Sequence, residues 1–208
     1  MTDFKRTATG PWVWLTAGFL LLVSLPVAAD PSASSTVKSA SERMLSALES
    51  RRAEIERDPS KIYGLVDQIL VPHFDFEMIT RAAVGRHWGR ASAAQQKALI
   101  EGFQQLLIRT YAKALLNYSG EEIRYLPERP GPKSTVVVPT EVREPGANPV
   151  PIEYRLYNRG GHWKVYDVKI DNVSLVSNYR SSFRSQIRQY GIDGLISRLN
   201  EMNRKGQG

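Results

Sequence analysis

The sequence contains no cysteine among its 208 residues. Disulfide bonds, thiol nucleophiles, thiol redox chemistry and thiolate metal sites are therefore excluded, and packing alone must hold the fold together. Histidine is scarce as well, since only His73, His87 and His162 occur. None of them lies in an HxxxH or HExxH spacing, so we expect no zinc site and place these histidines at the surface or at an interface.

The motifs of common enzymes are also missing. No serine lies in a GxSxG elbow, and Gly160-Gly161 lacks the helix and the Lys-Ser/Thr pair of a phosphate-binding loop. Asp167 and Asp171 are the best candidates for an acid–base pair, on one face of an expected strand. The favoured interpretation is that both carboxylates lie on a solvent-exposed face and pair with nearby lysines.

Long hydrophobic runs are absent except at the N-terminus. Residues 13–25 are mostly apolar, follow Lys5 and Arg6, and are broken by Pro26. The run is shorter than the roughly 20 residues that a membrane span needs. Val27-Ala28-Ala29 fits the small-residue rule for signal-peptide cleavage, so we expect cleavage after Ala29 and a soluble chain outside the cytoplasm.

The expected domain organisation follows from this cleavage. The 208 residues less these 29 leave 179, a length that suits one domain with a sizeable core. Residues 30–40 are rich in Ser, Ala and Pro and are expected to form a flexible leader. Residues 41–204 are expected to form the single domain, and residues 205–208 a short polar tail.

The net charge of the whole chain is +7, and removal of Asp3, Lys5 and Arg6 with the signal peptide leaves +6. For an exported chain this suits anionic membrane surfaces or acidic partner proteins rather than nucleic acid. Arg180, Arg184 and Arg188 recur every four residues along one expected helix. A solvated helix face is the favoured interpretation of these arginines, and contact with acidic partners is the alternative.

Helical spacing and strand alternation occupy different parts of the chain. Apolar residues recur at helical spacing over residues 41–56, 61–70, 75–85, 92–118 and 173–202, the last segment being interrupted at Gly191. Alternation typical of strands appears near residues 123–125, 135–138, 152–156 and 163–170. This order predicts an α+β fold in which a curved, four-stranded antiparallel sheet packs with several helices.

Helix caps are expected at several of these boundaries. Ser60 and Asp75 precede two of the helices, and Ser92 with Gln95 forms a capping box before the longest one. Asp171 is a candidate cap for the helix that follows the last strand.

Apolar faces are in excess on both the sheet and the helices. Periodicity alone leaves open whether they fill a core or line a cavity.

Four segments resemble the MlaC family, also called the toluene-tolerance auxiliary family. Residues 165–180 (VYDVKIDNVSLVSNYR) resemble its signature, and residues 66–75 resemble its V-D-x-x-L-x-P segment. Gly89 with residues 91–96 is similar to the start of a family helix, and residues 191–196 (GIDGLI) are similar to its C-terminal turn. The four segments span nearly the whole mature chain, in order.

The resemblance implies a periplasmic phospholipid carrier of Gram-negative bacteria. Members shuttle glycerophospholipid between an outer-membrane lipoprotein–porin complex and an inner-membrane MCE-domain ABC transporter, and so maintain outer-membrane lipid asymmetry. The resemblance implies no catalytic residue and no cofactor, with bound phospholipid as cargo, and we expect a monomer. It also implies that the acyl chains lie in an apolar cavity between sheet and helices.

The residues expected to bind lipid are those of the apolar faces. They are Phe103, Leu107, Tyr111, Val136, Val138, Tyr154, Leu156, Tyr166, Val168, Ile170, Val173, Val176, Tyr179 and Phe183. Three alternatives remain open: a hopanoid-associated carrier of the same family, a periplasmic adaptor with a solid core, and an enzyme with an acid or histidine turned into the pocket.

Overall fold

The computed structural model describes residues 32–205. The predicted signal peptide and its cleavage site lie outside these residues. The helical elements before the sheet are α1 (Ala33–Ser50), α2 (Arg52–Arg57), α3 (Lys61–Ile69), the 3-10 helix η1 (Val71–His73), α4 (Phe76–Val84), the 3-10 helix η2 (Gly85–Arg90) and α5 (Ala93–Leu116). The strands and last helix are β1 (Glu122–Tyr125), β2 (Arg129–Pro130), β3 (Val136–Arg143), β4 (Val150–Arg159), β5 (His162–Ile170), β6 (Val173–Ser174) and α6 (Leu175–Lys205).

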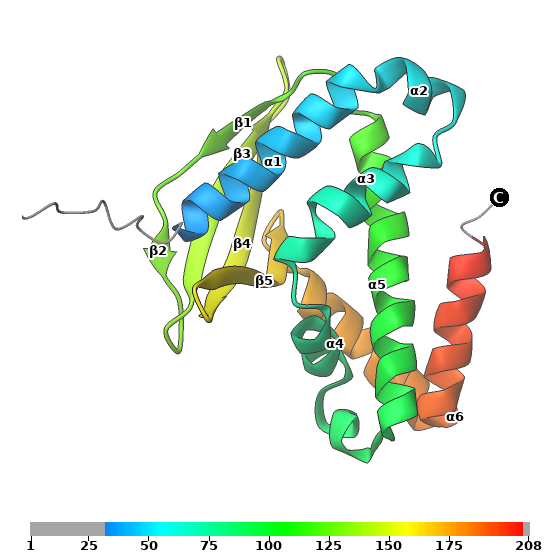
Figure 1. Cartoon of the computed structure of the whole chain (residues 1–208). Helices are drawn as coiled ribbons and strands as arrows, with labels where there is room; N and C mark the ends of the chain where they lie inside the picture. Colours follow the sequence, from blue (N-terminus) through cyan, green and yellow to red (C-terminus); the bar gives the residue numbers. More distant parts are fainter. Residues whose placement is uncertain (1–31, 206–208) are drawn as a thin grey trace, which may run out of the picture.

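The α+β class and the antiparallel sheet are confirmed. The strands follow the order β1-β3-β4-β5-β6, with β2 also paired to β3, and all of these pairs are antiparallel. The four predicted strands correspond to β1, β3, β4 and β5, while β2 and β6 add two residues each. Figure 1 shows the sheet on one side of the molecule, with α1 lying across it and α5 and α6 on the far side.

A β-bulge changes which side chains face the helices. Tyr154 pairs with Val168, but Leu156 pairs with Val165, so Tyr166 is the extra residue in β5. Because a bulge shifts the alternation by one residue, Val165 faces inward and is 3% exposed. Tyr166 points to the opposite face, where its ring lies 6.2 Å from that of Tyr157. The prediction that Tyr166 shares a face with Val168 is therefore wrong.

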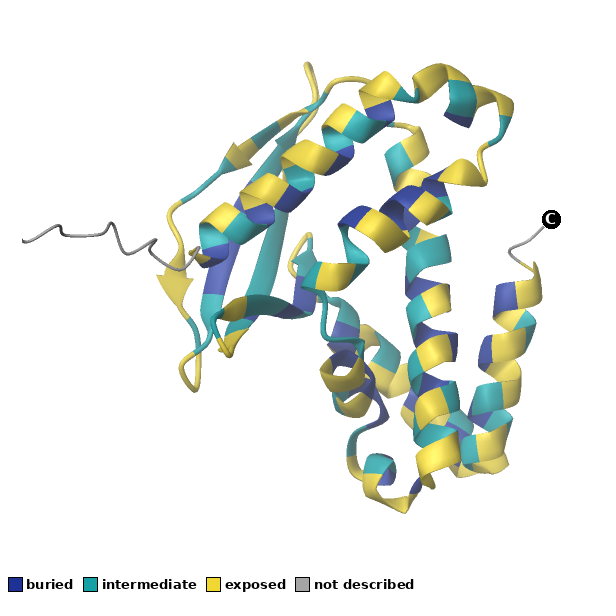
Figure 2. Cartoon of the chain, viewed as in Figure 1, coloured by how far each residue is buried: buried dark blue, intermediate teal, exposed yellow. Residues whose placement is uncertain are grey.

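Helix α1 begins inside the segment expected to be a flexible leader. Ser32 caps it by accepting a hydrogen bond from Ser35 N, and Ala33, Val37 and Ala40 are buried at helical spacing. The small side chains let α1 lie close against the sheet, so residues 33–40 are ordered by packing. Figure 2 shows the buried stripe of α1 turned toward the sheet and its outer face exposed. At the other end of the domain, Lys205 still belongs to α6.

The predicted caps are partly confirmed. Ser92 and Gln95 form the capping box of α5, and Asp75 accepts a hydrogen bond from Met78 N at the start of α4. Ser60 does not cap α3, because its hydroxyl hydrogen-bonds the carboxylate of Asp58 two residues earlier.

Helix α6 begins and bends at positions with clear local causes. Ser174 caps it by accepting from Ser177 N, whereas Asp171, the predicted cap, lies in the preceding turn at a φ of 47°. Gly191 has a φ of 72°, a conformation that favours glycine, and divides α6 into two arms. The second arm packs closely on α5, since a Cβ at Gly102 would lie 3.2 Å from Leu199 Cβ.

The buried apolar residues form three clusters rather than one. One joins α4, α5 and α6, a second joins α1, α2, α3 and α5, and a third joins α1 to the sheet. These clusters surround the interior region where the sheet, α3, α4 and α5 converge. Within residues 32–205, no helix has the length and hydrophobicity required to cross a membrane.

Candidate functional site

An apolar cavity of about 290 Å³ lies between the inner face of the sheet and the helices. Its volume is near the lower end of the range for pockets that hold drug-sized ligands. Its walls come from α3, η1, α4, α5, β4, β5 and the first turn of α6. The lining residues are Val66, Leu70, Val71, Phe74, Phe76, Ile79, Leu107, Ile108, Tyr111, Ala112, Ala114, Leu115, Ile152, Tyr154, Asp167, Val168, Ile170, Leu175 and Val176.

Only three of these residues carry polar side-chain atoms, namely Tyr111, Tyr154 and Asp167. An apolar ligand therefore gains by entering, at about 0.8 kcal/mol for each methylene removed from water. A charged or strongly hydrated group would lose its hydration without recovering it from the wall. The cavity lining therefore favours hydrocarbon over charged or strongly hydrated groups.

The two tyrosines remain neutral at physiological pH. Burial raises the pKa of Tyr154 to about 12, with a smaller contribution from nearby Tyr125. Burial raises the pKa of Tyr111 to about 12 as well, and the neighbouring Tyr179 hydroxyl adds to the shift. Neither phenol can serve as a base at neutral pH, because each holds its proton more tightly than a free tyrosine does.

Asp167 has a structural role at the cavity wall. It is 5% exposed, and its carboxylate accepts hydrogen bonds from Ser174 Oγ at 2.7 Å and from Val176 N at 3.2 Å. Arg155 lies 3.4 Å away and completes the set. These contacts fix the first turn of α6 against the sheet. The expectation of an exposed pair with nearby lysines is wrong for Asp167, because α6 covers it.

Residues 71–75 close one edge of the cavity and are fastened to β5. Phe74 forms a parallel bridge with Val165, whose carbonyl accepts a hydrogen bond from Asp75 N at 2.9 Å. The Asp75 carboxylate accepts a hydrogen bond from Tyr157 and pairs with Arg159 at 3.5 Å. Phe74, which lines the cavity, is therefore held at a fixed joint between sheet and helices.

Six of the fourteen predicted lipid-binding residues line the cavity. They are Leu107, Tyr111, Tyr154, Val168, Ile170 and Val176. They come from α5, from the inner face of β4 and β5, and from the start of α6, which the fold brings together from distant parts of the sequence.

The other eight predicted residues lie outside the cavity lining. Phe103, Tyr179 and Phe183 form an aromatic cluster between α5 and α6, with Phe103 4.8 Å in centroid distance from each of the other two rings. Val173 is 56% exposed, so it cannot line an enclosed space. Tyr166 points to the outer face of the sheet, as described above. The remaining three are packed in the cluster between α1 and the sheet: Val136, Val138 and Leu156.

Several lining residues were missed from the sequence. Val66 and Leu70 belong to an apolar helix face that was visible at their spacing of four. Phe74 and Phe76 flank a loop without periodicity, so no pattern indicated that they turn inward. Ile152 is a register neighbour of Ile170 on the inner face and could have been found from strand alternation.

Among residues 32–205, no group of three His, Asp or Glu side chains could hold a metal ion.

His87 is 7% exposed, contrary to the expected surface position, because η2 packs it against the helical core.

Comparison with known proteins gives one family. The family model described as MlaC protein matches residues 38–201. The intermembrane phospholipid transport system binding protein MlaC of Haemophilus influenzae is 25% identical over 184 residues, which is 86% of this chain and 86% of that protein. The toluene tolerance protein ttg2D of Pseudomonas putida is 26% identical over 184 residues, which is 86% of this chain and 85% of that protein.

A solved structure has the same fold. The phospholipid-binding protein from Ralstonia solanacearum, solved in complex with a phospholipid, superposes with a TM-score of 0.79. It is 35% identical in sequence, and the match covers 85% of this chain and 99% of that one.

Proposed function

Because the chain belongs to the MlaC family, we propose that it is a soluble periplasmic carrier of glycerophospholipid. The carrier binds the acyl chains in the apolar cavity and leaves the head group near solvent. The observation that carries the proposal is the cavity itself, whose lining is hydrocarbon apart from three residues. The phospholipid complex of the Ralstonia solanacearum protein supports it, since that relative is 35% identical over most of this chain.

The cavity must widen to load a two-chain lipid. Its volume of about 290 Å³ suits a drug-sized molecule, and a phospholipid is larger. The three separate apolar clusters suggest how widening occurs, because groups of helices can shift relative to one another without breaking a single continuous core. The joint at residues 71–75 is the natural pivot, since it ties α4 to the sheet edge.

Tight burial of acyl chains implies assisted release. Burying about ten methylenes from each of two chains would contribute about 16 kcal/mol before the costs of ordering and widening. Spontaneous escape into water would then be slow. We propose that docking to a membrane complex opens the cavity and hands the lipid over.

The proposed partners are those that the family resemblance implies. They are an outer-membrane lipoprotein–porin complex and an inner-membrane MCE-domain ABC transporter, between which the carrier maintains lipid asymmetry. Export would remove residues 1–29, leaving one lipid-binding domain that begins with α1. Catalysis is not part of the proposal, because Asp167 is engaged by α6 and the cavity tyrosines stay protonated.

Extraction of lipid from the purified native chain tests the cargo. Solvent extraction followed by mass spectrometry should recover glycerophospholipid in amounts comparable with the protein. Recovery of a polycyclic lipid instead would replace the cargo with a hopanoid. Absence of any lipid, together with no uptake from vesicles, would contradict the carrier function.

A further inference from the structure

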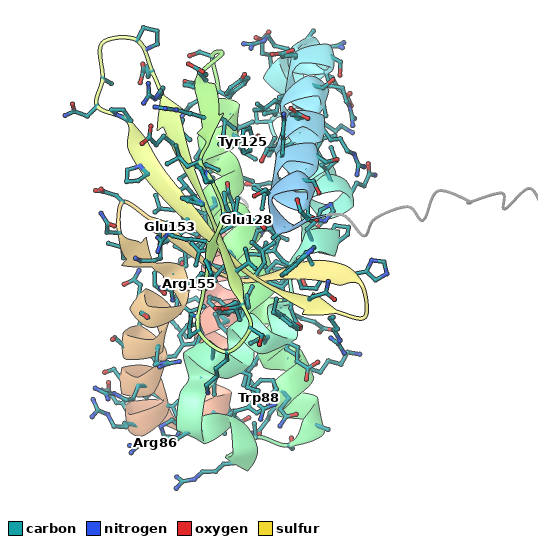
Figure 3. The ribbon with its side chains drawn as sticks, turned by 90° about the vertical axis from the view of Figure 1, so that its left-hand side faces the viewer. Arg86, Trp88, Tyr125, Glu128, Glu153 and Arg155 are labelled. Carbon is teal, nitrogen blue, oxygen red and sulfur yellow. The ribbon has the colours of Figure 1, made fainter. Side chains whose placement is uncertain are left out.

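Five arginines form a basic surface at the end of the helical part that lies away from the cavity. Arg86 and Arg90 come from η2, and Arg180, Arg184 and Arg188 come from the first arm of α6. All five are exposed, and we call them the arginine surface. Figure 3 shows Arg86 at this end of the ribbon, beside the first arm of α6, while Glu153 and Arg155 lie over the sheet.

The arginines lie close together because α6 packs against both α4 and η2. The three on α6 recur every four residues, so they form a row about 12 Å long on one helix face. Arg180 donates to Ala82 O at 2.8 Å and so ties the row to α4. The pKa of buried His87 is lowered by its burial and then by the charges of Arg86, Arg90 and Arg188, so all three act on the same imidazole.

The positive charge of this surface is not compensated within residues 32–205. No acidic residue occurs in residues 78–92 or 172–192. The nearby carboxylate of Asp193 accepts a hydrogen bond from Gln95 at 2.7 Å. No ion pair or hydrogen bond within residues 32–205 joins Arg86, Arg90, Arg184 or Arg188 to another side chain.

Several cations on the sheet, unlike those of the arginine surface, are paired with carboxylates. Arg129 and Lys169 both pair with Glu153, and Arg155 pairs with Asp167. The arginine surface thus stands out as a concentration of unpaired guanidinium groups, which repel one another and contribute little to the fold. An external anion would offset this repulsion.

The side chains between the arginines indicate the kind of anion. The exposed residues among them on α6 are small or polar: Ser177, Asn178, Ser181, Ser182, Ser185 and Gln189. Protein interfaces depend on clusters of aromatic or aliphatic anchors. The aromatic residues here are Trp88, which is partly buried between Arg86 and Arg90, and Tyr190, which is 59% exposed beyond Arg188 at the end of the row. A spread array of phosphates suits it better, since each guanidinium group can bind phosphate with two parallel hydrogen bonds.

We propose that the arginine surface binds the anionic head groups of a phospholipid bilayer and holds the carrier at the membrane surface. The row extends away from the cargo site, because Arg180 lies one turn beyond cavity-lining Val176 on α6 and Arg188 lies twelve residues beyond it, about 18 Å along the helix. The inference rests on the proposed carrier function for its purpose, but the bilayer contact can be measured without reference to cargo.

Vesicle flotation tests the inference with the exported chain. Vesicles of phosphatidylcholine with one-quarter phosphatidylglycerol should bind the chain at low salt, and pure phosphatidylcholine vesicles should not. High salt should release it, because exposed charges are screened. The triple variant R86Q/R184Q/R188Q should bind on the order of a hundredfold more weakly, at roughly one factor of five per arginine.

A matched variant controls for net charge. R43Q/R52Q/R57Q removes three exposed arginines from α1 and α2 and should bind like the wild type. Equal loss in both triple variants, or no binding of the wild type to anionic vesicles, would overturn the inference. Thermal melts check that both variants fold.

Lipid extraction from the same samples separates this inference from the proposed function. Retained cargo with no vesicle binding would overturn the arginine surface alone. Vesicle binding through these arginines without any cargo would support the surface and count against the carrier.

Discussion

Replacing Val168 by tryptophan should weaken lipid loading while leaving the fold intact. Val168 is 8% exposed, lies on β5 opposite Tyr154, and lines the cavity. Side chains stand roughly perpendicular to a sheet, so the indole must enter the space proposed for the acyl chains. Displacing about four methylenes removes about 3 kcal/mol of burial, a loss of roughly two-hundredfold in affinity.

The cost to stability should be modest. Overpacking a filled core costs about 1–3 kcal/mol, and Val168→Trp should lie at the lower end because its side chain extends into the cavity. The expected fall in melting temperature is about 2–4 °C for a domain of this size. Thermal melts followed by circular dichroism measure this fall, and mass spectrometry of extracted lipid measures loading.

Two controls make the result specific. Val150→Trp places the same side chain at a residue that is 42% exposed on β4, and it should load like the wild type. Val173→Trp should also load normally, because Val173 is 56% exposed. If Val168→Trp loads as well as Val150→Trp, the cavity is not where the acyl chains lie.

Three other perturbations test the packing around the cavity. Asp167→Ala should lower the free energy of unfolding by about 2–4 kcal/mol in urea titrations, since Arg155, Ser174 and the first turn of α6 lose their common acceptor; a loss below about 1 kcal/mol would contradict this role. Gly191→Ala should cost about 1–3 kcal/mol in the same assay, because a side chain is strained at a φ of 72°, and an unchanged midpoint would argue against the bend. The contribution of Tyr154 to stability should be fully present below pH 10 and decline as the pH rises toward 12. Its pKa is raised from 10 to about 12 in the folded chain, so the unfolded chain ionises first. Melts of Tyr154→Phe between pH 8 and 11.5 should show a smaller decline than those of the wild type.

Local sequence patterns predicted the order of elements well. Helical spacing located α3, α4 and α5 nearly to the residue, and alternation located the four long strands. These periodic signals lie within short segments, so they can be recognised without knowledge of tertiary contacts. The start of α1 was missed because Ala33, Val37 and Ala40 look like leader composition until the sheet supplies a surface for them.

The candidate site was harder to predict, because the sequence marks which residues are apolar but not whether another element packs against them. Phe103 shares an apolar face of α5 with Leu107 and Tyr111, but Phe103 packs against Tyr179 and Phe183 of α6, whereas Leu107 and Tyr111 line the cavity. The bulge at Tyr166 also leaves no mark in the alternation of apolar residues, because it arises where Leu156 of β4 pairs with Val165 of β5. The cavity lining and the bulge both depend on contacts between elements, which the pattern within one element does not contain.

The intact mass of the purified chain under native conditions tests the central claim most directly. The account predicts one species heavier than the protein by a single glycerophospholipid, and a smaller lipid-bound fraction for Val168→Trp prepared in the same way. A wild-type chain that carries no lipid, even after exposure to phospholipid vesicles and the proposed membrane complexes, would contradict it.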